Sequence, residues 1–321
     1  MIRLLGMGNA LTDVLMTIGS DDLLIELGLP KGSMQLINQE QFSTISTRMA
    51  DFPKHFVCGG SAANTITGAS KLGVDSGFIG KVYADEVGIN YKEDLHSYGV
   101  KSFLLEGQMA SGQSLVFISP DGERTFATFL GAAASLLPED IQPDFFSGSD
   151  LFYIEGYLVQ NHELILKAVQ MAKKEGLKVA LDLASYNVVE DHLSFIKDLI
   201  ANYVDILFAN EEEAKALTGL QPAEALEALA SQVEIAVVKI GEHGAMAIQG
   251  NERVIIPAFE AVCLDTTGAG DLFAAGFIYG MSTGKSLADC TRYGTITAGK
   301  VIEVIGPKMT HATWETIHTH F

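Results

Sequence analysis

The sequence predicts an α/β protein with a mostly parallel, doubly wound central sheet and one smaller β layer. Short apolar or β-branched runs alternate along the chain with amphipathic helical stretches, which is the pattern of βαβ units. Two segments break this alternation and replace the helices with polar stretches and Gly-containing turns. At 321 residues the chain is long enough for one large α/β domain with a small appendage.

The predicted strands of the main sheet are short and lie along most of the chain. The runs that indicate them are SGFIGKV (76–82), DLFYIEG (150–156), KVALDL (178–183), VDILFAN (204–210) and IAVVKIG (235–241). The helical stretches that alternate with them include NHELILKAVQMAKKEG (161–176) and EDHLSFIKDLIANY (190–203). Strands that alternate with helices in this way form a mostly parallel sheet.

The two interrupting segments indicate a small β lid. Residues 101–131 contain strand-like runs joined by Gly-containing turns, with the hairpin signal PDGE at 120–123. We assign residues 1–13, 58–100 and 132–321 to the α/β domain, and residues 14–57 and 101–131 to the inserted lid. Open α/β folds bind ligands at the carboxyl edge of the sheet, so a lid placed there could cover them. The edge strands of the lid could also pair two copies, which makes a homodimer through the lid a candidate assembly.

The net charge and the cysteine content reduce the number of partner classes and cell compartments that fit this protein. Lys and Arg number 21 against 40 Asp and Glu, and the resulting net charge of −19 disfavours nucleic acid and anionic membranes as partners. The three cysteines, Cys58, Cys263 and Cys290, are an odd number without a C-x-x-C pair, so they predict neither a disulfide framework nor a zinc knuckle. No uninterrupted apolar stretch of about 18 residues occurs. We therefore expect a protein of the reducing cytoplasm.

The stretch DTTGAGD at 265–271 places small residues between two aspartates, directly before the apolar run LFAAGFIYGM. Gly268 and Gly270 flank Ala269, so bare N–H groups can point outward at the start of a helix and bind an anion. Asp271 would lie in the first turn, where its carboxylate could take a proton from a hydroxyl that attacks a bound phosphate. The alternative is that Asp271 only complements the helix dipole and the glycines only make a turn. Five consecutive small residues favour the anion site, because a helix cap needs one.

A second glycine-rich stretch, CGGSAANTITGASKLG at 58–73, also leads into a helix. Gly59 and Gly60 precede it, and its many small residues permit close approach of a neighbouring backbone. Asn64 lies in the first turn, where its amide could face a ligand. The alternative is a helix that is only packed closely on a sheet.

These motifs resemble those of the ribokinase or PfkB family of carbohydrate and nucleoside kinases, and the resemblance covers nearly the whole chain. GGSAAN at 59–64 is similar to the family's N-terminal signature, and DTTGAGD matches its C-terminal signature without a substitution. The family's Asn-x-x-Glu motif has a counterpart in NEEE at 210–213. The resemblance implies a ribokinase-like three-layer α/β/α domain with a small β-sheet lid. It also implies transfer of the γ-phosphate of ATP to a hydroxyl group.

At the phosphate end of the site, the resemblance implies that Asp271 is the catalytic base. The backbone of residues 268–270 would form the anion hole for the γ-phosphate. Asn210 and Glu213 would help to organise Mg²⁺ and its waters, and Gly241 in VKIGEHGA would lie in the nucleotide loop. The residues alone leave an alternative, in which Asn210 is a turn residue at a strand end and Glu213 is an acid at a helix start.

At the acceptor end, the resemblance implies that Asp13, Gly60 and Asn64 bind sugar hydroxyls, with Asp13 at the end of the first strand. Asp13 could equally cap a turn. Asp265 falls where family members often bind a monovalent cation, so K⁺ joins ATP and Mg²⁺ among the expected cofactors.

The sequence indicates the identity of the substrate less strongly than it indicates the type of reaction. GNALTD at 8–13 resembles the start of adenosine kinases, and SAAN departs from the Lys-containing version typical of ribokinases. The aromatic candidates for a nucleobase slot are Phe126, Phe129 and Tyr157, of which at least one is expected in the core. Residues 101–131 also contain Phe103 and Phe117 but only two basic side chains, Lys101 and Arg124.

This balance favours a nucleoside over a sugar acid, whose carboxylate would need cationic partners. We therefore predict an ATP-dependent kinase for a primary hydroxyl of a nucleoside, with adenosine as the first candidate. A PfkB-type sugar kinase acting on fructose, ribose or 2-keto-3-deoxygluconate is the alternative. A non-catalytic ligand-binding protein on the same fold is the third hypothesis.

Overall fold

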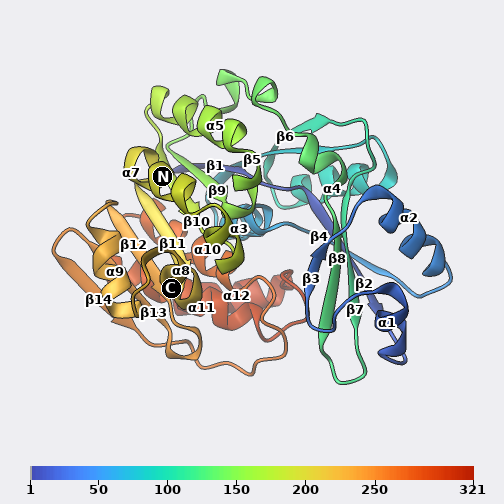
Figure 1. Cartoon of the computed structure of the whole chain (residues 1–321). Helices are drawn as coiled ribbons and strands as arrows, with labels where there is room; N and C mark the ends of the chain where they lie inside the picture. Colours follow the sequence, from blue (N-terminus) through green and yellow to red (C-terminus); the bar gives the residue numbers. More distant parts are fainter. Residues whose placement is uncertain (1) are drawn as a thin grey trace.

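The computed structural model describes residues 2–321 and contains two sheets, which confirms the predicted α/β fold with a second, smaller β layer (Figure 1). The large sheet has nine strands in the order β14-β13-β12-β11-β10-β9-β1-β5-β6. Its strands are β1 (Arg3–Met7), β5 (Asp75–Val82), β6 (Lys101–Glu106), β9 (Leu151–Glu155), β10 (Lys178–Asp182), β11 (Ile206–Asn210), β12 (Ile235–Lys239), β13 (Ala245–Gln249) and β14 (Glu252–Ile256). The seven neighbouring strands β12-β11-β10-β9-β1-β5-β6 all pair in parallel. Strands β13 and β14 pair antiparallel and form one edge of the sheet.

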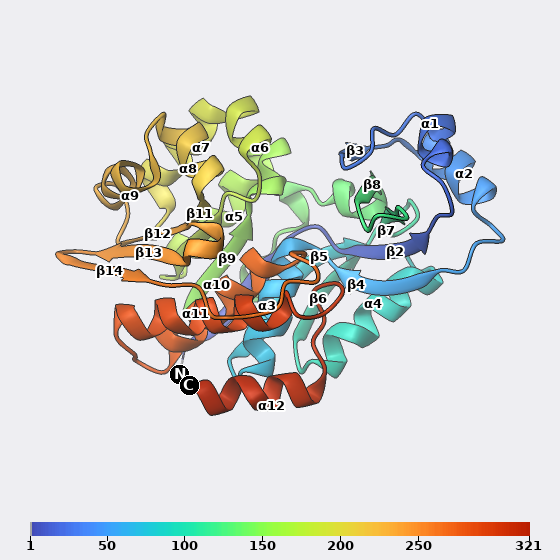
Figure 2. The same cartoon turned by 90° about the horizontal axis from the view of Figure 1, so that it is seen from below.

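Helices cover both faces of the large sheet and make three layers (Figure 2). Side chains of a strand alternate between the faces, so that Leu4 packs with the helices on one side and Leu5 with those on the other. On the first side lie α3 (Ser61–Lys71), α4 (Glu86–Ser97), α10 (Ala269–Ser282), α11 (Leu287–Val301) and α12 (His311–His320). On the second lie α5 (His162–Lys174), α6 (Tyr186–Asp191), α7 (Leu193–Tyr203), α8 (Glu211–Thr218) and α9 (Pro222–Ala230). Within residues 2–321, no helix has both the length and the apolar character needed to cross a bilayer.

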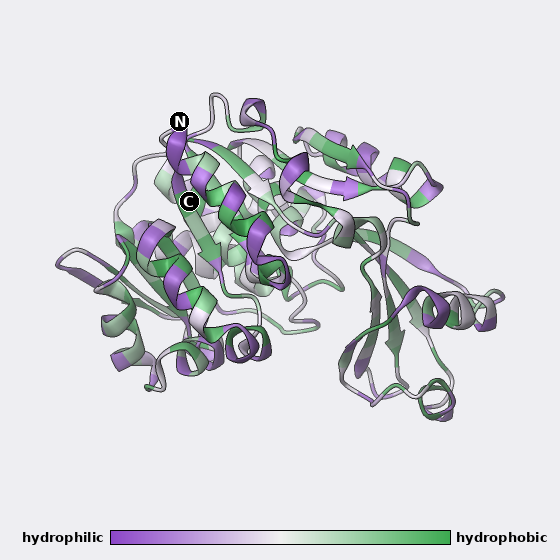
Figure 3. Cartoon of the chain, turned by 45° about the horizontal axis from the view of Figure 1, so that its top comes forward, coloured by the Kyte–Doolittle hydropathy of each residue, from purple (hydrophilic) through white to green (hydrophobic). Residues whose placement is uncertain are grey.

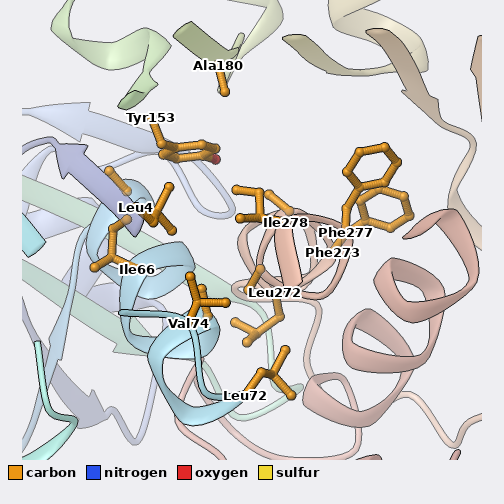
Figure 4. Packing of buried hydrophobic residues seen from close by; sticks show 14 of the residues in the cluster. Leu4, Ile66, Leu72, Val74, Tyr153, Ala180, Leu272, Phe273, Phe277 and Ile278 are labelled. Carbon is orange, nitrogen blue, oxygen red and sulfur yellow. The ribbon is translucent and has the colours of Figure 1, made fainter. Parts of the chain in front are cut away.

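Close packing of α3 on α10 brings the two glycine-rich motifs together. A methyl group on Gly68 of α3 would lie only 2.7 Å from the Leu272 side chain of α10. Figure 4 shows Ile66 of α3 and Leu272 of α10 on facing sides of the same apolar cluster, with Tyr153 of the sheet above them. The small residues of both helices therefore set how closely the two helix starts approach.

The small sheet forms a lid that stands out from the larger part of the molecule (Figure 3). Its order is β3-β8-β7-β2-β4, with β2 (Leu11–Thr17), β3 (Met34–Leu36), β4 (His55–Gly59), β7 (Gly112–Ile118) and β8 (Arg124–Phe129). One face packs against α1 (Asp22–Leu27) and α2 (Gln39–Arg48), around a core that includes Phe117 and Phe129. The lid therefore contains two helices, whereas the sequence indicated only a β layer between residues 14 and 57.

The structure also corrects two boundaries of the lid. Residues 101–106 form β6, which pairs with β5 at the edge of the large sheet, because α4 returns the chain in a parallel crossover. The lid sheet already begins at Leu11, so Asp13 lies within β2 and not at the end of the first strand. In β2, Thr12, Val14 and Met16 are buried while Asp13 is more exposed, and this period-two pattern is that of a strand with two different faces.

Candidate active site

A cavity of about 1300 Å³ lies between the carboxyl edge of the large sheet and the open face of the lid. It gathers most of the residues that the sequence predicted for the site, although they come from distant parts of the chain. The predicted residues that line it are Asp13, Gly60, Asn64, Asn210, Glu213, Gly241, Gly268, Ala269, Gly270 and Asp271. Asp265 is not in the lining.

Four neighbouring parallel strands end in a polar residue at this cavity. These are Glu155 of β9, Asp182 of β10, Asn210 of β11 and Lys239 of β12. Glu155 pairs in register with Asp182, and Asn210 with Lys239, while Asp182 pairs with Phe208, so the second pair lies two residues further along the strands than the first. The sequence prediction included only Asn210, although in each case a polar residue that closes an apolar run was the available signal.

Asp271 is held by hydrogen bonds from α3. Gly268 caps α10 with a left-handed φ of 79°, and Asp271 is the third residue of that helix. Its Oδ1 accepts a hydrogen bond from the Ser61 hydroxyl at 2.7 Å, and its Oδ2 accepts one from the Asn64 amide at 2.9 Å. Burial raises the pKa of Asp271 to about 6, even though these bonds favour the charged form. The carboxylate is therefore ionised near neutral pH and basic enough to accept a proton.

Glu155 fixes the start of α3 against the end of β1. It accepts hydrogen bonds from the backbone N–H of Asn9 at 2.9 Å, from the Asn9 amide at 2.8 Å and from the backbone N–H of Ala62 at 2.7 Å. Gly60 has a φ of 93°, and a side chain there would collide with the carbonyl oxygen of Asn9. The backbone before the first turn of α3 can thus adopt this positive φ and pass this close to Asn9 only with glycine at position 60.

Two oxygen-bearing side chains line the cavity near the start of α3. The Oδ1 atom of Asn64 is buried and has no hydrogen-bond partner among the described residues. Asp13 approaches from lid strand β2, and burial raises its pKa to about 7. Both groups can accept hydrogen bonds from hydroxyl groups of a ligand.

Asn210 and Glu213 form a reciprocal cap at the start of α8. The Asn210 oxygen accepts from the Glu213 N–H at 2.8 Å, and the Glu213 carboxylate accepts from the Asn210 N–H at 2.7 Å and from its amide at 2.8 Å. Burial raises the pKa of Glu213 to about 7, although the nearby Lys239 charge opposes this. Asn210 thus ends a strand and Glu213 lies in the first turn of a helix, as in the alternative drawn from the sequence, and both residues also line the cavity.

The residues present fit Mg²⁺ that is held mainly by substrate phosphates. No group of three or more His, Cys, Asp or Glu side chains within residues 2–321 converges on a metal position. Mg²⁺ commonly keeps several waters and uses one or two carboxylates together with phosphate oxygens. Glu213 lies at the cavity wall, where its carboxylate can contact Mg²⁺ through a water bound to the ion.

Asp265 contacts the lid. Its carboxylate pairs with Arg124 of β8 at 2.8 Å and accepts hydrogen bonds from Thr267 and from the Gly306 N–H. Burial alone would raise the pKa of Asp265, but these hydrogen bonds and the Arg124 charge lower it. In this conformation the Arg124 guanidinium is thus a cationic partner of the Asp265 carboxylate. K⁺ binding at Asp265 stays a prediction.

The aromatic candidates divide between cavity and core. Tyr157 and Phe126 line the cavity, and the Tyr157 hydroxyl donates to the Ala184 carbonyl oxygen at 3.2 Å. Phe129 stacks on Phe42 in the lid core, as expected for at least one candidate. Among the other aromatic residues of 101–131, Phe103 packs with the main domain.

Comparison with known proteins agrees with this geometry. Residues 37–313 match the model of the pfkB family of carbohydrate kinases. Among solved structures, a probable sugar kinase from Rhizobium etli is 34% identical with a TM-score of 0.90, and the alignment covers 99% of this chain and 98% of that one. The adenosine kinase from Sinorhizobium meliloti is 35% identical with a TM-score of 0.89, covering 100% of this chain and 99% of that one.

The curated relatives include sugar-acid kinases by name. The 5-dehydro-2-deoxygluconokinase of Bacillus licheniformis is 28% identical over 283 residues, which are 83% of this chain and 86% of the relative. The family match spans most of the chain, and the structure of the Sinorhizobium meliloti adenosine kinase aligns over its full length. The chain therefore belongs to the pfkB family of carbohydrate kinases, which are phosphotransferases with an alcohol group as acceptor.

Proposed function

We propose that this chain is an ATP-dependent kinase that phosphorylates a primary hydroxyl of a nucleoside, with adenosine as the first candidate. The observation that supports the reaction is the position of Asp271. Its carboxylate has a raised pKa and lies in the first turn of α10, directly after the bare backbone of residues 268–270. A proton acceptor beside an anion-binding helix start suits phosphoryl transfer to a hydroxyl.

In the proposed reaction, Asp13, Gly60 and Asn64 hold the hydroxyls of the acceptor. Asp271 takes the proton of the primary hydroxyl of the acceptor, while the hydroxyl oxygen forms a bond to the γ-phosphorus. The bond from that phosphorus to the bridging oxygen breaks, and ADP leaves with the electron pair. The N–H groups of residues 268–270 stabilise the charge on the transferred group. Asn210 and Glu213 would order the waters of Mg²⁺, which would offset phosphate charge, and Gly241 would approach the nucleotide.

The cavity wall favours a nucleoside acceptor. Tyr157, Phe126 and Leu130 line it, together with Met34 and Leu36, which are 49% and 50% exposed. Exposed apolar groups around a cavity suit a flat apolar ligand such as a nucleobase.

A sugar acid, as in the named 5-dehydro-2-deoxygluconokinase relatives, would need a cationic partner for its carboxylate. Among the described residues of the lining, the single basic side chain is Lys239, which lies beside Gly270 at the phosphate end. A kinase for fructose, ribose or 2-keto-3-deoxygluconate remains the second candidate, since family relatives include sugar kinases. A purely ligand-binding protein is disfavoured, because it has no use for a base beside an anion site.

The substrate is tested with a panel of acceptors and Mg·ATP. We expect adenosine to give the highest kcat/KM among adenosine, inosine, ribose, fructose, 2-keto-3-deoxygluconate and 5-dehydro-2-deoxygluconate, because only the nucleosides fill the apolar wall. Product formation is followed by ADP release coupled to a dehydrogenase assay, with acceptor-free reactions as the control. A sugar or sugar acid that exceeds adenosine tenfold would contradict the nucleoside proposal and leave the kinase assignment in place.

Glu213→Gln is expected to raise the Mg²⁺ concentration for half-maximal activity by roughly tenfold, because the carboxylate orders the metal's water shell. Glu163→Gln is the matched control, since Glu163 lies in the first turn of another Asn-capped helix, α5, and is exposed. Magnesium titrations of both variants make the comparison. An unchanged titration for Glu213→Gln would remove this residue from the metal site.

We also propose a cytoplasmic location and, as one assembly, a homodimer through the lid. The three cysteines are free, which suits a reducing compartment. The edge strands β3 and β4 of the lid offer backbone groups for pairing. The net charge of −19 supports a small-molecule substrate over nucleic acid.

A further inference from the structure

Lys239 is a positively charged side chain in a cavity lined by many carboxylates. It ends β12, and its side chain is 15% exposed. Within the part of the chain that the structure describes, no other Lys or Arg lines the cavity. The carboxylates that line it are Asp13, Glu155, Asp182, Asp191, Glu211, Glu212, Glu213 and Asp271. A polyphosphate that enters this cavity meets repulsion from these carboxylates and attraction from one cationic side chain.

Asp182 holds the Lys239 ammonium in place. Its Oδ2 accepts a hydrogen bond from Lys239 Nζ at 2.9 Å, and its Oδ1 accepts one from the Ala184 N–H at 3.1 Å. Ala184 has a φ of 65°, a left-handed conformation that is unfavourable for a residue with a Cβ. Such a strained residue beside a cavity is often linked to function. Asp182 is therefore a rigid support whose side chain is only 4% exposed.

The ammonium is charged and has unused donors. Burial favours the neutral amine, but the carboxylates of Asp182 and Glu213 outweigh it and raise the pKa of Lys239. An ammonium group has three N–H donors, and the structure uses one of them, in the bond to Asp182. Two donors remain for a ligand.

Lys239 also lies against the anion-binding turn. A methyl group on Gly270 would be 3.1 Å from Lys239 Nζ, so the ammonium is next to the second residue of α10. The N–H groups of that turn and the ammonium therefore approach one region of the cavity from two sides. A residue other than glycine at position 270 would stand between them.

We propose that Lys239 is a catalytic residue that binds the oxygens of the transferred γ-phosphoryl group, and that Asp182 is its positioning residue. This inference rests on the proposed kinase function. Lys239 keeps all its protons throughout, because Asp271 takes the proton of the acceptor hydroxyl. Its positive charge offsets the charge on the phosphoryl oxygens as the bond to ADP breaks.

A purely structural role for the ion pair would predict a different result. A buried ion pair adds little net stability compared with apolar residues of similar size. If the pair only tied β10 to β12, its loss would affect all nucleotides equally. A contact with the γ-phosphoryl group would discriminate between nucleotides with and without that group.

The test compares the affinities of Lys239→Met for Mg·AMP-PNP and Mg·ADP by titration calorimetry. We expect binding of AMP-PNP to weaken by about 10- to 100-fold, as for loss of a charge-assisted hydrogen bond, and binding of ADP to change much less. The kcat should fall by a similar factor. Lys178→Met is the matched control, because Lys178 lies at the start of β10 in an exposed pair with Glu234 and should leave both affinities unchanged.

Lys239→Met leaves Asp182 as an unpaired buried charge, so Asp182→Asn combined with Lys239→Met provides a neutral pair for the same titrations. Equal weakening of AMP-PNP and ADP, or no weakening of either, would overturn the inference. The kinase proposal is tested separately by the acceptor panel. If the wild type binds AMP-PNP but phosphorylates no acceptor, that proposal fails while the role of Lys239 in phosphate binding is still decided by the titrations.

Discussion

Asp271→Asn is expected to lower kcat by roughly 10²- to 10⁴-fold while affinity for Mg·ATP stays nearly unchanged. The substitution removes the proton acceptor and keeps the backbone N–H groups of residues 268–270. The local structure should survive it, because the amide oxygen of the substituted side chain can still accept from Asn64. The new amide N–H can donate to the Ser61 hydroxyl, which now accepts where it donated to the carboxylate.

The control for this variant is Asp289→Asn. Asp289 has the same position in α11 that Asp271 has in α10, namely the third helical residue, but it pairs with Ser286 and Arg292 away from the cavity. Steady-state kinetics of both variants, with ATP affinity from calorimetry, give the comparison. A fall in kcat of less than tenfold for Asp271→Asn would show that another group is the base. In the wild type, the rate should fall as the pH is lowered through about 6, because a protonated Asp271 cannot accept a proton.

Gly268→Ala is expected to lower kcat/KM by roughly 10²- to 10³-fold, since it displaces the turn that presents the N–H groups. Gly268 has a φ of 79°, and a Cβ there would lie 2.7 Å from the Cβ of Pro307. Left-handed backbone at alanine costs about 1–2 kcal/mol, and the collision adds to it, so the free energy of unfolding should fall by about 2 kcal/mol or more.

Gly284→Ala separates backbone strain from damage to the site. Gly284 follows α10 with a φ of 68°, and a Cβ there would meet nothing within 4 Å. We expect it to lose about 1 kcal/mol of stability and to keep full activity. Urea unfolding and steady-state kinetics measure both effects. A Gly268→Ala protein that is destabilised like Gly284→Ala but fully active would exclude this turn from the phosphate site.

Short motifs allowed much of the site to be predicted from the sequence. The small residues of 265–271 and 59–64 indicated two helix starts, and the structure places both at one cavity. Glu155 and Asp182 belong to no short motif, and Lys239 lies within VKIGEHGA, where only Gly241 was assigned a role. They are single polar residues at the ends of apolar strands, and only the parallel order of β9, β10 and β12 in the sheet brings them together. Their association depends on tertiary pairing, which local pattern does not encode.

The lid was predicted with less accuracy for a related reason. The run KSFLLE at 101–106 has the period and composition of a strand in either sheet, and α4 decides that it joins the large one. The helices α1 and α2 are short, with 6 and 10 residues, and gain their stability by covering the lid sheet. Asp13 lines the cavity, but it lies on a later strand than predicted, because the chain leaves β1 at Gly8 and starts a new strand only three residues later.

The order of strands in the lid also has a consequence for the nascent chain. Strand β2 ends at Thr17, but its parallel partner β7 begins at Gly112, and β3 pairs with the still later β8. At translation rates of roughly 5–20 residues per second, the intervening segment takes on the order of 5–20 s to emerge from the ribosome. Strand β4 and the helices α1 and α2 emerge within that interval, but the edge of β2 that pairs with β7 stays open, and open strand edges are prone to aggregate. Substitutions that weaken the β2–β7 pairing should therefore reduce the yield of soluble protein during synthesis more than the activity of the molecules that complete folding.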